Sequence, residues 1–196
     1  MPLKRLVPNL IPLNDFNSPV QTGLYEPITL LELPSGLVQG DYFDLTEQEA
    51  NNLSDAAVGT LHAGRYRLVQ IEAGATQANI AVGRIGLMRT TALGLNVVTS
   101  YDRGLGPGMH PVIFLNAGTP GNYVFVQELG IATVQLKTPL TNVGPAIGDI
   151  INSVATGLAD DPTSQNYVSA TLGVSLQLPV ANTKILVQLE TPVLQG

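Results

Sequence analysis

The chain has 196 residues and a formal net charge of −6, with 12% charged residues, 44% hydrophobic residues and no cysteine. A chain of this length can bury a core without help, and the lack of cysteine excludes disulfide scaffolds, thiolate metal sites and cysteine nucleophiles. The few basic residues form no tail or dominant patch, so the composition argues against nucleic-acid binding. So little charge is typical of a protein partly covered by partners.

The first 40 residues are interrupted by prolines at positions 2, 8, 12, 19, 27 and 34. Proline at this spacing excludes a helix or a central strand, and it breaks the apolar run that a signal peptide needs. No stretch approaches the ~18 apolar residues of a membrane-spanning helix, so we expect no membrane contact. We predict that residues 1–45 form an extended arm.

The arm is rich in apolar side chains, which disordered tails usually lack, so we expect it to lie against its own core or a neighbouring subunit. We favour a neighbour, because a proline-stiffened arm loses little entropy on docking. Removal of residues 1–40 should then spare the folded core and weaken attachment or oligomerisation. The candidate contact residues are Leu6, Val7, Leu10, Ile11, Leu13, Leu30 and Leu31.

Residues 46–58 are predicted to contain one short helix. Thr46 and Glu49 have the spacing of a capping box, and apolar residues follow them. Gly59 is a plausible stop, so we expect the helix to cover about residues 46–57.

The remaining residues, 59–196, read as a β-rich domain. Alternating apolar residues predict half-buried strands with inward faces at Ala132, Val134 and Leu136, at Leu172, Val174, Leu176 and Leu178, and at Ile185, Val187 and Leu189. Glycine- and proline-rich turns separate these strands. The predicted fold is all-β, an antiparallel β-sandwich or a small barrel, with an extended Pro-rich N-terminal arm and one short helix.

Few residues suggest catalysis. His62 and His110 are the only histidines, and neither has a nucleophile or a second ligand at a suitable spacing. The glycine-rich residues 104–108 lack the order and the following helix of a phosphate loop. We therefore assign no catalytic or cofactor-binding residue, expect no cofactor, and predict that the chain is not an enzyme.

Two further clusters receive structural interpretations. Asp160, Asp161 and Asn166 offer oxygen ligands, but they miss the calcium-loop pattern and suit a turn, so no metal residue is assigned. Four arginines form the densest basic group in the sequence, and Glu72 is the only acidic residue near them along the chain. We expect their side chains to be ordinary solvated charges. These arginines are Arg65, Arg67, Arg84 and Arg89.

Residues 111–127, with the sequence Pro-Val-Ile-Phe-Leu-Asn-Ala-Gly-Thr-Pro-Gly-Asn-Tyr-Val-Phe-Val-Gln, resemble the head-decoration proteins of tailed bacteriophages. The similarity continues in order through a glycine and a second alternating strand, and as a whole it covers about residues 64–194. Its later pieces are residues 130–134, 146–149, 170–176 and 185–189. From the residues themselves we read a β-hairpin with a Pro-Gly-Asn turn, followed by an alternating strand.

The resemblance implies a virion structural protein, made in the host cytoplasm, that binds the outside of the major capsid shell and cements its expanded lattice. It also implies a homotrimer, with the major capsid protein and other copies of the chain as partners. A tail- or fibre-associated structural or receptor-binding module is the alternative. A hydrolase acting through His62 or His110 is a third reading.

Overall fold

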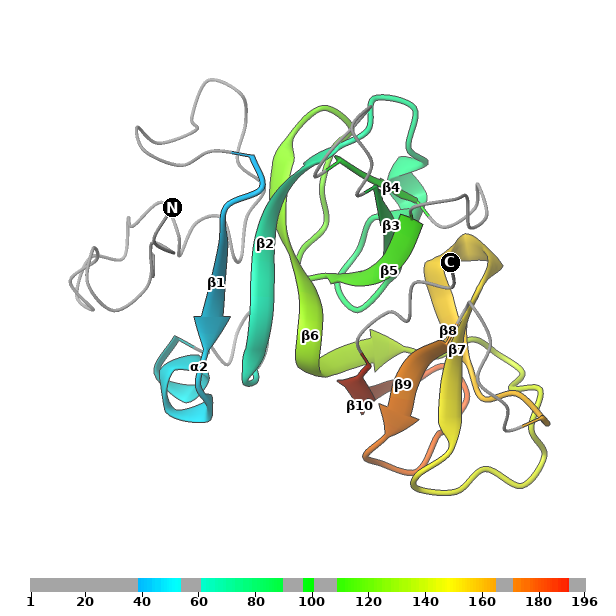
Figure 1. Ribbon diagram of the computed structural model, residues 1–196. Helices are drawn as coiled ribbons and strands as arrows, with labels where there is room; N and C mark the ends of the chain where they lie inside the picture. Colours follow the sequence, from blue (N-terminus) through cyan, green and yellow to red (C-terminus); the bar gives the residue numbers. More distant parts are fainter. Residues whose placement is uncertain (1–38, 54–60, 90–96, 101–108, 165–170, 191–196) are drawn as a thin grey trace.

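The structure, a computed structural model, describes residues 39–53, 61–89, 97–100, 109–164 and 171–190 (Figure 1). The seven candidate contact residues of the arm lie outside these ranges. The strands within them are β1 (Tyr42–Leu45), β2 (Gly64–Ile71), β3 (Ile85–Arg89), β4 (Val97–Ser100), β5 (Met109–Phe114), β6 (Tyr123–Gln135), β7 (Ile150–Val154), β8 (Leu158–Asp160), β9 (Thr171–Ser175) and β10 (Lys184–Leu189). The helices are α2 (Glu47–Leu53) and the short 3₁₀ turns Gln77–Asn79 and Ala155–Gly157. The all-β prediction is confirmed.

Strands β2, β4, β3, β5 and β6 form a closed barrel. They are neighbours in that order, and an additional pairing of β2 with β6 closes the ring. Only β2 and β4 run parallel within it. Ten buried apolar residues fill the barrel, among them Val69, Met88 and Phe114. Closure removes the sheet edges that these strands would otherwise expose.

A second sheet continues from the barrel in the order β6, β10, β9, β7 and β8. Its inner face packs against the outside of the barrel wall, because one buried cluster contains Ile85 and Leu87 of β3 together with Val134 and Val187. On β3, Met88 faces the opposite way, into the barrel. The fold thus combines both predicted alternatives: a small barrel and a sheet packed against it.

Strand β6 belongs to both parts of the fold. Its first half pairs with β2 and β5, and its second half pairs with β10. The sequence interpretation of two successive strands here is wrong: one 13-residue strand bends at Gly130, where φ is +93°. The predicted hairpin is confirmed, since β5 and β6 pair antiparallel and the Asn122 N–H donates to the Thr119 carbonyl at 3.1 Å.

Strand β1 and helix α2 lie on the outer side of β2. Although the predicted arm reached residue 45, its last four residues form β1, which pairs antiparallel with β2. Helix α2 begins after Thr46 with the expected capping box: the Thr46 N–H donates to Glu49 at 2.9 Å, and the Glu49 N–H donates to the Thr46 hydroxyl at 3.3 Å. Residues 54–57 of the predicted helix lie outside the described part. No helix in the described ranges is long and apolar enough to cross a membrane.

One predicted apolar face is wrong. Leu172 is buried as expected, but Leu176 and Leu178 are exposed, and Ser175 is buried instead. The cause is a β-bulge: Ile151 pairs with Gly173 and Asn152 with Thr171, which leaves Leu172 without an opposite residue. An extra residue exchanges the two faces of a strand from that point on. The faces predicted for residues 132–136 and 185–189 are confirmed.

Candidate functional site

The most unusual surface feature is a group of large apolar side chains on two neighbouring loops. We call it the loop patch. Its members are Val143, Ile147, Leu176, Leu178 and Val180, with exposed fractions between 42% and 100%. The β6–β7 loop and the β9–β10 loop carry them, at the same end of the second sheet (Figure 1, bottom).

Backbone hydrogen bonds join these two loops. The Gly148 N–H donates to the Ser175 carbonyl at 3.0 Å, and the Ser175 N–H donates to the Asp149 carbonyl at 2.9 Å. The buried Ser175 hydroxyl accepts from the Gly148 N–H at 3.1 Å and donates to the Ala146 carbonyl at 3.3 Å. The bulge in β9 therefore turns Ser175 inward, where it fastens the opposite loop, and turns the next residue, Leu176, outward, whereas Leu178 lies in the loop beyond the end of β9.

Two buried carboxylates, Asp160 and Asp161, and the half-buried Asp149 fasten the rest of the β6–β7 loop. Asp160 accepts from the Thr141 N–H at 3.0 Å and pairs with Lys137 at 2.7 Å. Asp161 accepts from the Asn142 side-chain amide at 3.2 Å, and Asp149 accepts from the Ala146 N–H at 2.6 Å. Turn chemistry thus explains the Asp160-Asp161 pair. The third suggested ligand, Asn166, lies outside the described residues, and the described ranges contain no group of three or more metal-binding side chains.

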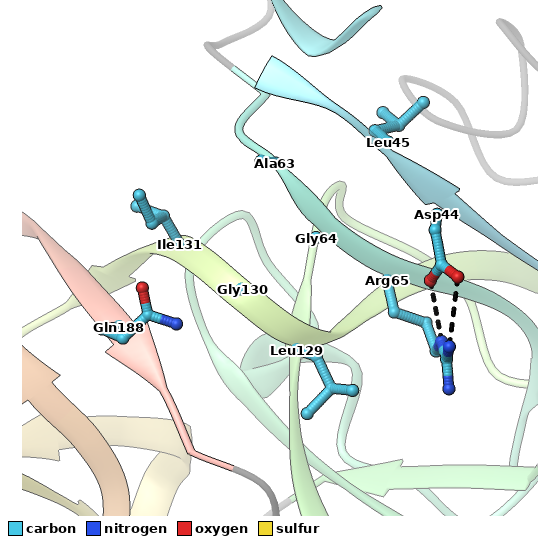
Figure 2. A pocket seen from close by; sticks show the side chains of 9 residues that line it. All are labelled: Asp44, Leu45, Ala63, Gly64, Arg65, Leu129, Gly130, Ile131 and Gln188. Atoms are coloured by element: carbon cyan, nitrogen blue, oxygen red, sulfur yellow. Dashed lines mark hydrogen bonds and ion pairs between the residues drawn. The ribbon is translucent and has the colours of Figure 1, made fainter.

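A shallow, open groove of about 470 Å³ lies where β6 passes from the barrel to the second sheet (Figure 2). Leu45 and Leu129 supply apolar lining, and Asp44, Arg65 and Gln188 supply polar groups. The remaining lining residues are Ala63, Gly64, Gly130 and Ile131. Figure 2 shows Asp44 and Arg65 pointing toward each other, so the most reactive groups at the groove are already paired.

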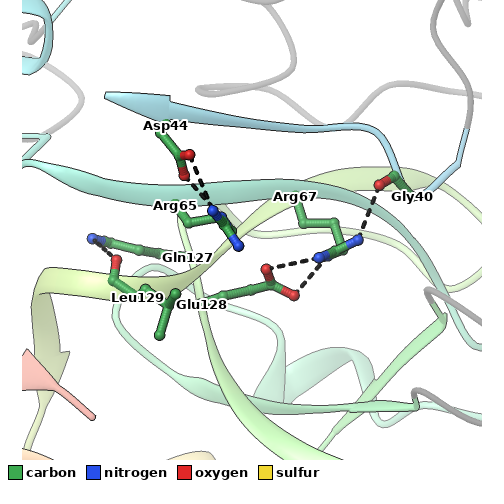
Figure 3. A network of polar contacts seen from close by, with 7 residues as sticks. All are labelled: Gly40, Asp44, Arg65, Arg67, Gln127, Glu128 and Leu129. Carbon is green, nitrogen blue, oxygen red and sulfur yellow. Dashed lines mark hydrogen bonds and ion pairs between the residues drawn. The ribbon is translucent and has the colours of Figure 1, made fainter. Parts of the chain in front are cut away.

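Two arginines of β2 make cross-strand ion pairs (Figure 3). Arg65 donates to Asp44 of β1 at 2.8 and 3.1 Å, and Arg67 donates to Glu128 of β6 at 2.6 and 3.1 Å. The Tyr42 ring lies 4.6 Å from the Arg65 guanidinium and 5.1 Å from that of Arg67. These contacts join three strands through paired charges.

The sequence predicted ordinary solvated charges for the four arginines, but each of them has a partner in the structure. Arg89 pairs with Glu72 at 3.1 Å, and Arg84 donates to the Thr156 carbonyl at 2.7 Å. The sequence indicated Glu72 as the only opposing acid, because Asp44 and Glu128 are distant along the chain and become neighbours only through strand pairing.

Glu128 is a buried carboxylate at one end of the barrel. Its side chain is 9% exposed, and His110 of β5 lies 3.6 Å from the same carboxylate oxygen, Oε1, that Arg67 contacts at 2.6 Å. Burial alone would raise the pKa of Glu128, but contact with His110 and hydrogen bonds from Arg67 outweigh burial and hold the pKa below its usual value of 4.5.

This lowered pKa predicts acid sensitivity. A carboxylate whose pKa is lower in the folded state than in the unfolded chain stabilises the fold above the unfolded value, and that contribution disappears as pH falls through the folded value. We expect the free energy of unfolding, measured in urea from neutral pH to below 4.5, to decrease less in Glu128→Gln than in the wild type. An equal decrease in both proteins would contradict this assignment.

The two histidines occupy different surroundings. His62, before β2, lies 3.9 Å from Glu47, while His110 lies beside Glu128. The Tyr66 hydroxyl donates to the His62 carbonyl at 2.6 Å, so that segment is fixed by its backbone. The structure does not bring these histidines to one shared partner, and residues 104–108 lie outside the described ranges.

Sequence reasoning missed the loop patch because alternation placed Leu176 and Leu178 in the core. A possible signal was Gly173, which sits at the bulge, since isolated glycines in strands often mark bulges or close backbone approaches. Comparisons with family models, curated proteins and solved structures find no match to this chain. The resemblance to decoration proteins therefore stays a prediction.

Proposed function

We propose that the chain is a structural protein of a bacteriophage virion that binds the outside of the major capsid shell and stabilises its expanded lattice. The observation that carries this proposal is a contrast among the described residues: many of their charged groups are paired internally, but several of their large apolar side chains are exposed. The arginines and carboxylates that could take part in chemistry are paired with one another, whereas large apolar side chains are exposed at the loop patch. Such a surface suits a protein that acts by covering another protein.

The ordered resemblance over residues 64–194 supplies the identity of the partner. Its quoted pieces fall on β5, β6, β9 and β10 and on the loop before β7, so they include strands of both the barrel and the second sheet. A cementing protein acts by mass action: binding only the expanded lattice, it lowers the free energy of that state by RT ln(1 + [L]/Kd) per site. Trimerisation would add avidity, because several copies then bind together.

Co-sedimentation tests the proposal. Full-length protein is mixed at micromolar concentration with expanded shells that lack decoration, and the shells are pelleted. We expect the protein to pellet with the shells and to raise their melting temperature. Protein that stays in the supernatant at these concentrations would contradict the capsid role.

The same assay tests the arm, but the structure changes where the truncation should end. Gly40 donates its N–H to Leu68 and its carbonyl accepts from Arg67, so truncation must stop at residue 38. We expect a 39–196 chain to keep its melting temperature within a few degrees, to lose trimers, and to bind shells about tenfold more weakly. Aggregation of the truncated chain would mean that the arm belongs to its own core.

A further inference from the structure

The loop patch has the chemistry of a neutral contact surface. The nearby carboxylates of Asp149 and Asp160 accept internal hydrogen bonds, and Lys137 is paired with Asp160. Lys184, at the start of β10, is an exposed charge beside the β9–β10 loop. With so little unpaired charge, attraction to a partner must come mainly from burial of apolar surface.

Internal hydrogen bonds hold both loops that carry the patch. On the β9–β10 side, the Leu186 N–H donates to the Gln177 side chain at 3.0 Å, and the Thr183 hydroxyl donates to the Val180 carbonyl at 2.6 Å. On the β6–β7 side, the Gly144 N–H donates to the Asn142 side chain at 3.0 Å. A surface that is already ordered loses less entropy on binding.

The size of the loop patch discriminates between its possible occupants. Five side chains at these exposures present an area on the order of 500 Å², below the roughly 800 Å² per partner that a stable protein pair buries. A second copy bound through this patch alone would therefore dissociate readily. A lattice differs, because several copies and the arms of each copy bind it together and their contacts reinforce one another.

We infer that the loop patch is the surface by which the folded body contacts the capsid lattice, and that it binds an uncharged, apolar area of the major capsid protein. This inference rests on the proposed function. The patch lies at the end of the second sheet, whereas the arm joins the body at β1, on the far side of the barrel (Figure 1). The body would then be held at two separate places.

Co-sedimentation with expanded shells, using the full-length chain, tests the inference through changes of apolar residues to serine. The test variants are Leu176→Ser with Leu178→Ser, and Ile147→Ser. The control is Leu129→Ser, a half-buried leucine of the groove. We expect the patch variants to bind about tenfold more weakly or worse and the control to bind as the wild type does. Binding of the wild type should persist in about 1 M NaCl, which screens charge–charge attraction.

Each other outcome has a distinct meaning. If the patch variants bind shells as well as the wild type does, the loop patch is not the contact surface, and the capsid role itself is unaffected. Loss in Leu129→Ser alone would move the contact to the groove. A change in the oligomeric state of the free patch variants, measured by light scattering, would make the patch an interface between copies and overturn the inference. No binding by the wild type would overturn the capsid role itself. The melting temperature of each variant shows whether it folds.

Discussion

Gly130→Ala is expected to lower the free energy of unfolding by about 3–5 kcal/mol, because two penalties coincide at this position. Its φ of +93° is a conformation that side chains with a Cβ rarely adopt. An added Cβ would also meet the Ala63 carbonyl and the backbone of Gly64, which is the residue of β2 paired with Gly130. Urea denaturation followed by circular dichroism measures the loss.

Gly121→Ala separates the two penalties. Gly121 has nearly the same φ, +92°, but a Cβ there would meet nothing within 4 Å. We expect this variant to lose only about 1 kcal/mol, the penalty of the backbone conformation alone. Equal losses at the two glycines would contradict the close approach of β2 and β6 and, with it, the closure of the barrel at this point. If Gly130→Ala is insoluble while Gly121→Ala folds, the change at Gly130 is the more damaging of the two, as predicted.

Arg67→Met is expected to cost about 3 kcal/mol of stability. The change removes both hydrogen bonds to Glu128, whose carboxylate is 9% exposed, and leaves it buried without its strongest partner. Removing one member of a buried ion pair is far more damaging than its net attraction suggests, since the remaining charge has lost its water. The bond from Arg67 to the Gly40 carbonyl is also lost, which should loosen β1.

The neighbouring arginine provides the control. Arg65→Met removes a similar two-bond pair on the same strand, but Arg65 and Asp44 are 33% and 54% exposed. Exposed pairs contribute little, so we expect a loss below about 1 kcal/mol. Both changes also remove a cation beside Tyr42, so that effect is shared. A larger loss for Arg65→Met than for Arg67→Met would contradict the burial assigned to Glu128.

Local patterns predicted much of this fold. The capping box located the start of α2, and alternation identified the buried faces of the second half of β6 and of β10. The turn before β6 followed from its proline and glycine. These features depend on residues close together in the sequence. Closure of the barrel does not, because it depends on β2 pairing with β6 about sixty residues later, which no local pattern encodes.

The candidate site was less predictable for the same reason. Arg67 lies 61 residues from Glu128, so their pairing follows from strand order rather than from spacing. The exposure of Leu176 in the loop patch depends on a bulge in β9 that is defined by its partner β7. Alternation read without that bulge puts Leu176 inside, and read past the end of β9 it also puts Leu178 inside. The sequence therefore indicated the class of fold, whereas the exposed surface required the register of each strand.

Electron cryomicroscopy of expanded shells incubated with the full-length chain tests the central claim most directly. The account predicts density for the barrel and second sheet on the outer surface of the shell, with the β6–β7 and β9–β10 loops against the major capsid protein. Density confined to the tail, or bound chains whose loop patch faces solvent, would contradict it.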